Sequence, residues 1–356
     1  AIVPETTVIE ISAESDTPQG AVALADATAA SLSETVAEIE SAPGAESPVQ
    51  LAVVQQARTP EKPVHPVLAV YVALGAALAL VAAAAFVLVR EALDMRIHGE
   101  RDINAVTDAP ILGTIAVDSK SKQRPLVVHA DPLSARAESY RVLRTSLQFI
   151  ELKGRSRTFV VTSPAAGAGK STTIANLALA LADAGQRVML VDADLRQPKL
   201  AKYMGIEGAV GLTDVLTGNA ALGDVIQPWR DTSLSVLAAG RIPPNPSELL
   251  GSKVMAALIA QLEADFEYVL FDSPPLLPVA DAVVLSEHVS EVIVVVSAGR
   301  TTKHHLAMAA RRLRSVGSEI GGVVLTMVPA RGAETYDYGR DRAVAAGLTH
   351  RPTSTP

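Results

Sequence analysis

The chain has 356 residues, enough for two or three structural units at roughly 150 residues each. It contains no cysteine, which excludes a disulfide framework, a thiolate zinc site and a cysteine nucleophile. The net charge of −7 arises in residues 1–66, which hold ten acidic and two basic side chains. The remainder is close to neutral and lacks the basic excess of nucleic-acid-binding proteins, so no nucleic-acid partner is expected.

Residues 1–66 are predicted to form a small α+β segment. Alternating apolar residues at 8–12 and 49–57 indicate two strands, and helical spacing over 20–41 indicates a helix between them. The proline-rich stretch 58–66 indicates an extended connector. Because the chain starts at alanine rather than methionine, we expect it to be a fragment or a processed product.

Residues 67–89 are 23 consecutive positions without a charged side chain. A helix of that length covers about 34 Å, enough to cross the hydrocarbon core of a bilayer, so one membrane span is predicted. Three arginines follow the run closely, against one arginine and one lysine just before it. This bias favours a cytoplasmic C-terminal side. Residues 90–130 are expected to be a juxtamembrane linker.

From about residue 131 the pattern changes to alternating strands and helices. The apolar runs are, in order, TFVVT, RVMLVD, LSVLAA, YVLFD, EVIVVVS and GGVVLTMV, with helical stretches between most of them. Such alternation predicts an α/β domain with a doubly wound, mostly parallel sheet covered by helices on both faces. We place this domain at 131–332, followed by a flexible, tyrosine-containing tail at 333–356.

The first of these runs is followed by a glycine-rich loop, SPAAGAGKSTT, and then by a helix. Gly167 and Gly169 would let backbone N–H groups surround phosphates, Lys170 would neutralise phosphate charge, and the Ser171 hydroxyl would ligate magnesium. Pro164 stands where the usual phosphate-loop motif has its first glycine, so the loop entry must differ. The order of strand, loop and helix predicts phosphate binding.

Carboxylates follow two further strands. Asp192 ends the run VMLVD, with Asp194 and Arg196 just beyond it, and Asp272 ends YVLFD. A single carboxylate at such a position often only caps the next helix. Three of them beside a lysine-bearing phosphate loop fit magnesium-assisted phosphoryl transfer, which needs oxygen ligands and a proton acceptor.

Together these motifs resemble those of the bacterial tyrosine kinases, whose fold is similar to that of MinD/ParA-type ATPases. Glu138, Arg141 and Arg144 resemble the ExxRxxR oligomerisation helix of that family, and the stretch GRIPPNPSELL supports the same reading. The resemblance is close over 130–330. Residues 1–115 look, less specifically, like the end of a Wzz-type polysaccharide chain-length determinant with its second membrane helix.

The resemblance implies ATP and Mg²⁺ as cofactors. It implies catalytic roles for Lys170, Asp192, Asp194 and Asp272, metal binding by Ser171, Asp194 and Asp272, and nucleotide binding by Gly167, Ala168, Gly169, Lys170, Ser171, Thr172 and Arg196. Asp192 would be the base toward a tyrosine hydroxyl, with Asp194 in the outer shell of the metal and Asp272 on a metal-bound water. Tyr336 and Tyr338 would be the phosphorylated residues.

The expected protein is thus a tyrosine autokinase of the bacterial plasma (inner) membrane, with a cytoplasmic kinase domain and an extracytoplasmic N-terminal segment. It would regulate the synthesis and export of an extracellular or capsular polysaccharide. Its expected partners are other copies in a homo-oligomeric ring, the polysaccharide assembly and export machinery, and a tyrosine phosphatase.

Two other functions remain open. One is a chain-length regulator whose ATP-binding domain controls oligomerisation without kinase activity, which the presence of only two tail tyrosines favours. The other is a membrane-tethered MinD/ParA-like ATPase. Ala165, which occupies the position of the signature lysine of those enzymes, argues against it.

Overall fold

The computed structural model describes residues 8–40, 51–59, 61–62, 67–118, 124–150 and 157–329. The chain divides into two compact units, Ala1–Leu93 and Asp94–Pro356. The first unit contains the helices α1 (Pro18–Glu40) and α2 (Leu68–Ala92). The predicted helix is therefore formed, but the strand expected at 8–12 is not, because only Ile9 makes an isolated bridge there. The described part of 49–57 is irregular as well.

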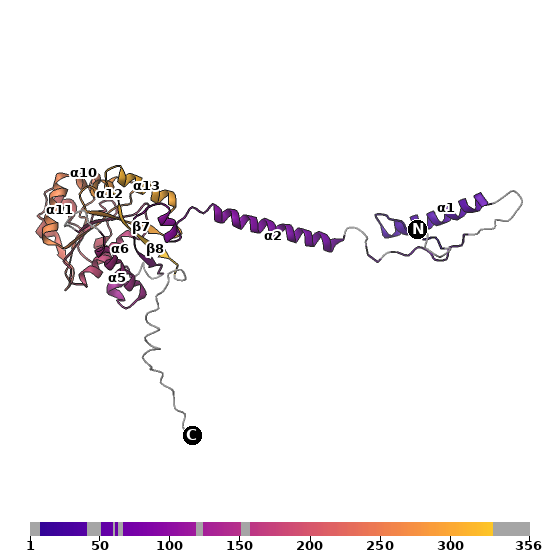
Figure 1. Ribbon diagram of the computed structural model, residues 1–356, viewed down its shortest axis with the longest axis horizontal. Helices are drawn as coiled ribbons and strands as arrows, with labels where there is room; N and C mark the ends of the chain where they lie inside the picture. The colour runs from indigo at the N-terminus through magenta and orange to yellow at the C-terminus, as the bar shows by residue number, and fades with distance from the viewer. Residues whose placement is uncertain are drawn as a thin grey trace, which may run out of the picture. The chain divides into compact units, whose positions relative to one another are not determined.

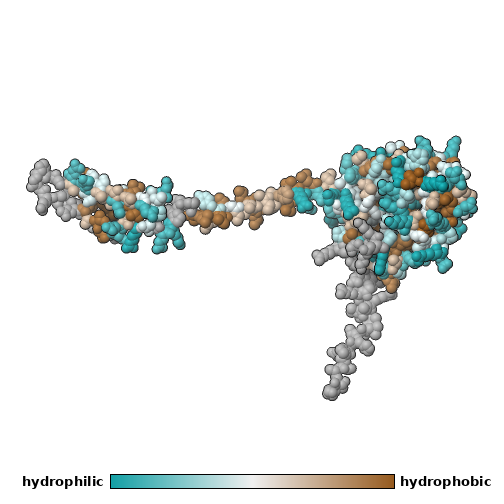
Figure 2. Space-filling view, turned by 180° about the vertical axis from the view of Figure 1, so that it is seen from behind, coloured by the Kyte–Doolittle hydropathy of each residue, from teal (hydrophilic) through white to brown (hydrophobic). Residues whose placement is uncertain are grey.

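Helix α2 has the length and composition of a membrane span. Its segment Leu68–Glu91 has a mean hydropathy of 2.7, and none of it is buried. Apolar side chains cover this helix in the space-filling view (Figure 2). Within the described residues it is the one helix long and apolar enough to cross a bilayer.

The second unit is built on an eight-stranded sheet, in the order β1-β8-β7-β2-β6-β3-β5-β4. The strands are β1 (Ile111–Ala116), β2 (Thr158–Thr162), β3 (Val188–Asp192), β4 (Ile226–Pro228), β5 (Leu234–Leu237), β6 (Tyr268–Asp272), β7 (Glu291–Ser297) and β8 (Ile320–Val328). Every neighbouring pair is parallel except β4 and β5. The six predicted strands are thus confirmed, and the mostly parallel sheet with them.

Helices cover both faces of the sheet, as predicted (Figure 1). One face packs against α4 (Val127–Ala130), α5 (Ala135–Gln148), α6 (Lys170–Ala182) and α7 (Leu200–Met204). The other packs against α3 (Glu100–Asn104), α8 (Leu212–Leu216), α10 (Pro246–Leu250), α11 (Lys253–Asp265), α12 (Asp281–Ser286) and α13 (Lys303–Arg314). A short α9 (Leu222–Val225) precedes β4. Alternate side chains of each strand enter opposite cores, as in β2, where Phe159 and Val160 lie in different clusters.

The segment expected to be a linker, 90–130, belongs instead to the second unit from Asp94 onward. Strand β1 pairs in parallel with β8 and forms one edge of the sheet. Before it, Ile97 is fully buried, and its backbone exchanges hydrogen bonds with Thr301 and Gly299. The apolar content of this stretch is too short and interrupted to indicate a strand, and its partner lies some 200 residues away in the sequence.

We expect Ile97→Ala to lower the free energy of unfolding of the second unit by about 2–5 kcal/mol, because it opens a cavity in a closed core. Met95→Ala is the matched control, since Met95 is 56% exposed. Trp229, the single tryptophan of the chain and almost fully buried in this unit, reports unfolding by its fluorescence during urea denaturation. Equal stability of the two variants would show that the segment around Ile97 is a linker after all.

Candidate nucleotide and phosphoryl-transfer site

The loop between β2 and α6 has the backbone form of a phosphate cradle. Gly167 and Gly169 adopt φ values of 83° and 87°, a left-handed conformation that glycine reaches without strain. Helix α6 begins at Lys170, and Thr173 N–H donates to the Gly169 carbonyl at 2.9 Å. The unpaired N–H groups at the start of this helix favour an anion. All the predicted loop residues lie here, at the end of the loop or in the first turn of α6: Gly167, Ala168, Gly169, Lys170, Ser171 and Thr172.

Strand β8 and the segment that follows β6 hold this loop from either side. The Thr326 hydroxyl of β8 donates to the Ala168 carbonyl at 2.7 Å. On the other side, the Leu276 N–H donates to the Ser163 carbonyl at 2.8 Å, and the Leu277 N–H donates to the Pro164 carbonyl at 3.3 Å. The Pro164 carbonyl therefore accepts one of the hydrogen bonds that fix the loop. Proline can do this although it lacks an N–H, because the bond uses only its carbonyl.

Two of the three predicted acidic residues contact Lys170, and the third lies beside one of them. Lys170 Nζ lies 3.5 Å from Asp194 Oδ2 and 3.8 Å from Asp272 Oδ1. Asp192 and Asp272 are opposite each other in the register of β3 and β6. All four side chains are almost completely buried. The structure thus brings together Lys170, Asp192, Asp194 and Asp272, while their individual roles stay predictions.

Asp272 is the carboxylate whose capacity to accept hydrogen bonds is least used. It is fully buried, and neither of its oxygens accepts a hydrogen bond from a described residue. Burial raises its pKa, and the nearby Lys170 charge and Ser171 hydroxyl oppose that rise. Unsatisfied buried oxygens are costly unless a ligand completes them. A carboxylate and a hydroxyl beside a phosphate cradle are the ligand types of Mg²⁺, so these residues fit a bound magnesium nucleotide.

Asp192 is more firmly engaged. Its Oδ2 accepts hydrogen bonds from the N–H groups of Lys199 at 3.0 Å and Leu200 at 2.9 Å, which fixes the start of α7. Its Oδ1 accepts one longer bond of 3.3 Å from the Asp194 N–H. Burial, followed by the like charge of Asp272, raises the pKa of Asp192 to about 7. One carboxylate therefore both anchors a helix and titrates near neutrality.

Arg196 has a partner that the sequence did not reveal. Its Nε and Nη2 donate to Asp281 Oδ2 and Oδ1 at 2.8 and 3.1 Å. Asp281 is fully buried at the first position of α12 and also accepts from the Ser247 hydroxyl. The resemblance assigns Arg196 to the nucleotide, whereas here its guanidinium is held by a carboxylate. An acid at a helix start was the only signal for Asp281 in the sequence.

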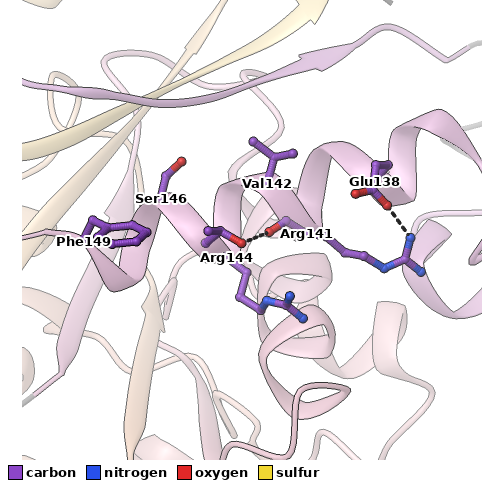
Figure 3. Close-up of a pocket in the computed structure, with 7 residues that line it drawn as sticks. Glu138, Arg141, Val142, Arg144, Ser146 and Phe149 are labelled. Atoms are coloured by element: carbon purple, nitrogen blue, oxygen red, sulfur yellow. Dashed lines mark hydrogen bonds and ion pairs between the residues drawn. The ribbon is translucent and has the colours of Figure 1, made fainter. Parts of the chain in front are cut away.

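The three residues of the predicted oligomerisation helix, α5, have partners within the chain. Glu138 and Arg141 form an ion pair of 2.8 Å (Figure 3). Arg141 also donates to the Pro132 carbonyl. Arg144 donates to the Ala180 carbonyl of α6 and is half-buried. A groove of about 370 Å³ runs along this helix and ends at the exposed Phe149. Tyr336 and Tyr338 lie outside the described residues.

Comparison with known proteins places this site in a family. A profile of the ParA group, described as NUBPL iron-transfer P-loop NTPase, matches residues 155–337. The tyrosine-protein kinase YwqD of Bacillus subtilis is 38% identical over 216 residues, which cover 61% of this chain and 91% of YwqD. The putative tyrosine-protein kinase CapB of Staphylococcus aureus is 31% identical, with 62% and 98% covered. The chain belongs to the bacterial tyrosine-protein kinases. Its fold is that of the ParA-like P-loop NTPases, a fold that implies nucleotide binding.

Solved structures agree with this membership of the tyrosine-kinase family. The kinase domain of the Escherichia coli tyrosine kinase ETK matches with a TM-score of 0.61 and 28% identity, covering 67% of this chain and 96% of that domain. The BceF tyrosine kinase domain matches with a TM-score of 0.61 and 32% identity, with 66% and 100% covered. Some relatives are much longer: the chain spans 42% of the putative tyrosine-protein kinase EpsB of Ralstonia nicotianae, at 32% identity.

In this family member we expect Asp272→Asn to stabilise the nucleotide-free protein by about 1–3 kcal/mol at pH 8. It removes a buried charge that accepts no hydrogen bond and that the Lys170 ammonium, 3.8 Å away, offsets only in part. A carboxylate whose folded pKa is raised stabilises the fold below its unfolded pKa, about 3.9 for aspartate, and this contribution is lost as pH rises through the folded pKa. The gain should therefore be smaller at pH 5 than at pH 8.

Urea denaturation at both pH values measures this gain. MgADP serves as the control, because it should raise the stability of the wild type more than that of the variant. A nucleotide-free variant less stable than the wild type at pH 8 would contradict the assignment of Asp272 as an unsatisfied ligand group.

Proposed function

We propose that the chain is a membrane-anchored, ATP- and Mg²⁺-dependent protein-tyrosine kinase that phosphorylates the tail of another copy of itself. The observation that carries this proposal is Lys170 placed between Asp194 and Asp272 at the start of α6. The names of two relatives support the same activity, since YwqD is a tyrosine-protein kinase and ETK a tyrosine kinase.

In this proposal the phosphate loop binds the nucleotide through its backbone N–H groups, and Lys170 neutralises charge on the transferred phosphate. Ser171, Asp194 and Asp272 would hold magnesium, directly or through water, as oxygen ligands do. A bound magnesium ion supplies charge neutralisation for the phosphates. Asp272 orients this arrangement because it is fixed at the end of a central strand.

Asp192 Oδ1 is the atom that accepts the proton of the attacking tyrosine hydroxyl in this proposal. This oxygen carries only the long bond from the Asp194 N–H, whereas Oδ2 is committed to two N–H groups of the α7 start. A pKa of about 7 for Asp192 suits a group that must accept a proton at neutral pH. The tyrosine oxygen then bonds to the γ-phosphorus, the bond to the bridging oxygen breaks, and ADP leaves.

Tail tyrosines are the proposed acceptors because the other tyrosines are poorly placed. Tyr140 and Tyr268 are buried in the core, at 1% and 0% exposure, and Tyr71 lies in the apolar helix α2. Tyr203 of α7 is half-buried. This leaves Tyr336 and Tyr338 as the acceptors of choice.

Transfer between copies requires an assembly, and we assign α5 to it. Within one chain Glu138 and Arg141 form an ion pair with each other. In an assembly this pair would have to open, so that each side chain could pair with a charge on the neighbouring copy. The exposed side chains Val142 and Phe149 beside them add apolar area to such a contact. Phosphates on the tails would then repel or re-dock neighbours and loosen a ring.

The proposed biological role is regulation of extracellular polysaccharide synthesis and export. One relative, 30% identical, is a putative tyrosine-protein kinase in the cps region of Klebsiella pneumoniae. The proposed topology has residues 1–66 outside the cytoplasm, α2 in the membrane and the nucleotide-binding unit inside. A phosphatase would reverse the modification.

We expect Lys170→Met to abolish incorporation of labelled phosphate from γ-labelled ATP, because the transferred charge loses its neutralising partner. The double variant Tyr336→Phe, Tyr338→Phe should also lose the label but should still hydrolyse ATP. Mapping of labelled residues in the purified full chain makes the measurement. Label that persists in the double variant, for example on Tyr203, would show that the acceptors lie elsewhere, and hydrolysis without any labelled tyrosine in the wild type would favour the non-kinase assembly protein.

The topology can be tested with single cysteines, because the chain has none of its own. A membrane-impermeant maleimide should label Ser31→Cys of α1 in intact cells with a permeable outer layer. It should label Ala260→Cys of α11 only after the plasma membrane is opened. Both positions are exposed, so a difference in labelling reports the side of the membrane. The reverse pattern would overturn the proposed orientation.

A further inference from the structure

Three segments far apart in the sequence meet at the carboxylate of Asp281. Arg196 comes from the loop after β3, Ser247 from α10, and Asp281 itself begins α12. Oδ1 of Asp281 accepts from both Arg196 Nη2 and Ser247, and Oδ2 accepts from Arg196 Nε. Because Asp281 is fully buried, this junction fixes the arginine from its inner side.

The outer side of Arg196 is open. Its side chain is 42% exposed, and its remaining terminal nitrogen, Nη1, has no hydrogen-bond partner among the described residues. The bidentate contact orients the guanidinium before any ligand arrives, which reduces the entropy lost on binding. Arg196 therefore presents two directed N–H donors at the surface, with the exposed Lys199 three residues further on.

This donor lies next to the reacting groups. Arg196 follows Asp194 by two residues in the loop after β3. Asp194 in turn lies 3.5 Å from Lys170 Nζ. The loop after β3 therefore carries both a buried carboxylate in contact with Lys170 and, two residues later, a side chain that is 42% exposed.

We propose that Arg196, positioned by Asp281 and Ser247, is a specificity-determining residue that binds acidic side chains flanking the acceptor tyrosine. This inference rests on the proposed function. The occupant is the tail of a second copy, whose sequence ETYDYGRD carries Glu334 and Asp337 beside its tyrosines. Two carboxylates within two residues of Tyr336, of which Asp337 also adjoins Tyr338, provide the anion that an oriented guanidinium binds best.

The same chemistry would also suit a phosphate of the nucleotide, so the test must separate the two anions. The enzyme is the full chain in detergent carrying Tyr336→Phe and Tyr338→Phe, which cannot be labelled on its tail. The acceptor is the full chain with Lys170→Met, which cannot transfer phosphate. Label transferred between them gives separate KM values for the acceptor and for ATP.

Arg196→Gln in the enzyme should raise the KM for the acceptor roughly threefold to fivefold, the upper part of the range for an ion pair at a protein surface. Glu334→Gln with Asp337→Asn in the acceptor should produce a similar rise with the unchanged enzyme. Combining both changes should add little, because each removes the same contact. Asp281→Asn should also raise the acceptor KM by releasing the guanidinium. Arg311→Gln, which removes an exposed arginine of α13, is the matched control and should leave this KM within twofold.

If the combined changes raised the acceptor KM by the product of the two separate rises, the inference would be overturned, because Arg196 and the acidic side chains would then act independently. A rise in the KM for ATP instead of that for the acceptor would assign Arg196 to the nucleotide and overturn it as well. Trp229 fluorescence during urea denaturation identifies any variant that fails to fold, and the acceptor changes then decide the question alone. Absence of any transfer between the two otherwise unchanged partners would overturn the proposed function and this inference with it.

Discussion

The contact of Lys170 with Asp194 and Asp272 is the interaction on which the site depends. Three carboxylates buried side by side carry a large desolvation cost, and a single lysine offsets only part of it. The part of the desolvation cost that Lys170 does not offset raises the pKa of Asp192 and the pKa of Asp272. The folded protein therefore holds an excess of negative charge that a cation would relieve. Binding of a magnesium nucleotide would thus stabilise the fold by the same interactions that prepare the reaction.

The sheet creates this arrangement through its strand order. Strand β6 lies between β2 and β3, so the phosphate loop after β2 and the carboxylates after β3 flank Asp272 at one edge. The parallel register sets Asp192 directly opposite Asp272. On the far side of β7, β8 adds Thr326, which holds the Ala168 carbonyl of the loop. A slip of one residue in any of these pairings would turn the side chains to the other face of the sheet.

Much of the site was predictable because its residues belong to short, contiguous sequence motifs. The glycines, Lys170 and the acids at the ends of apolar strands each have a local signature, and parallel strands bring their ends together. Contacts between distant segments had no such signature. Nothing in the sequence couples Arg196 to Asp281, which lies 85 residues further on, or Arg144 to the Ala180 carbonyl. Strand β1 was missed for the same reason, since its six residues become a strand only when β8 is beside them.

The two tasks of Asp192, anchoring α7 and taking a proton, would conflict if the helix depended on this carboxylate alone. A protonated carboxyl accepts hydrogen bonds more weakly than a carboxylate, so its hold on the Lys199 and Leu200 N–H groups would weaken during transfer. The C-terminal end of α7 is held by a separate hydrogen bond, from the Trp229 indole N–H to the Met204 carbonyl at 2.9 Å. Trp229 is itself buried and covered by the Arg230 guanidinium. Helix α7 can therefore keep its place while Asp192 changes charge, which allows one residue to perform both tasks.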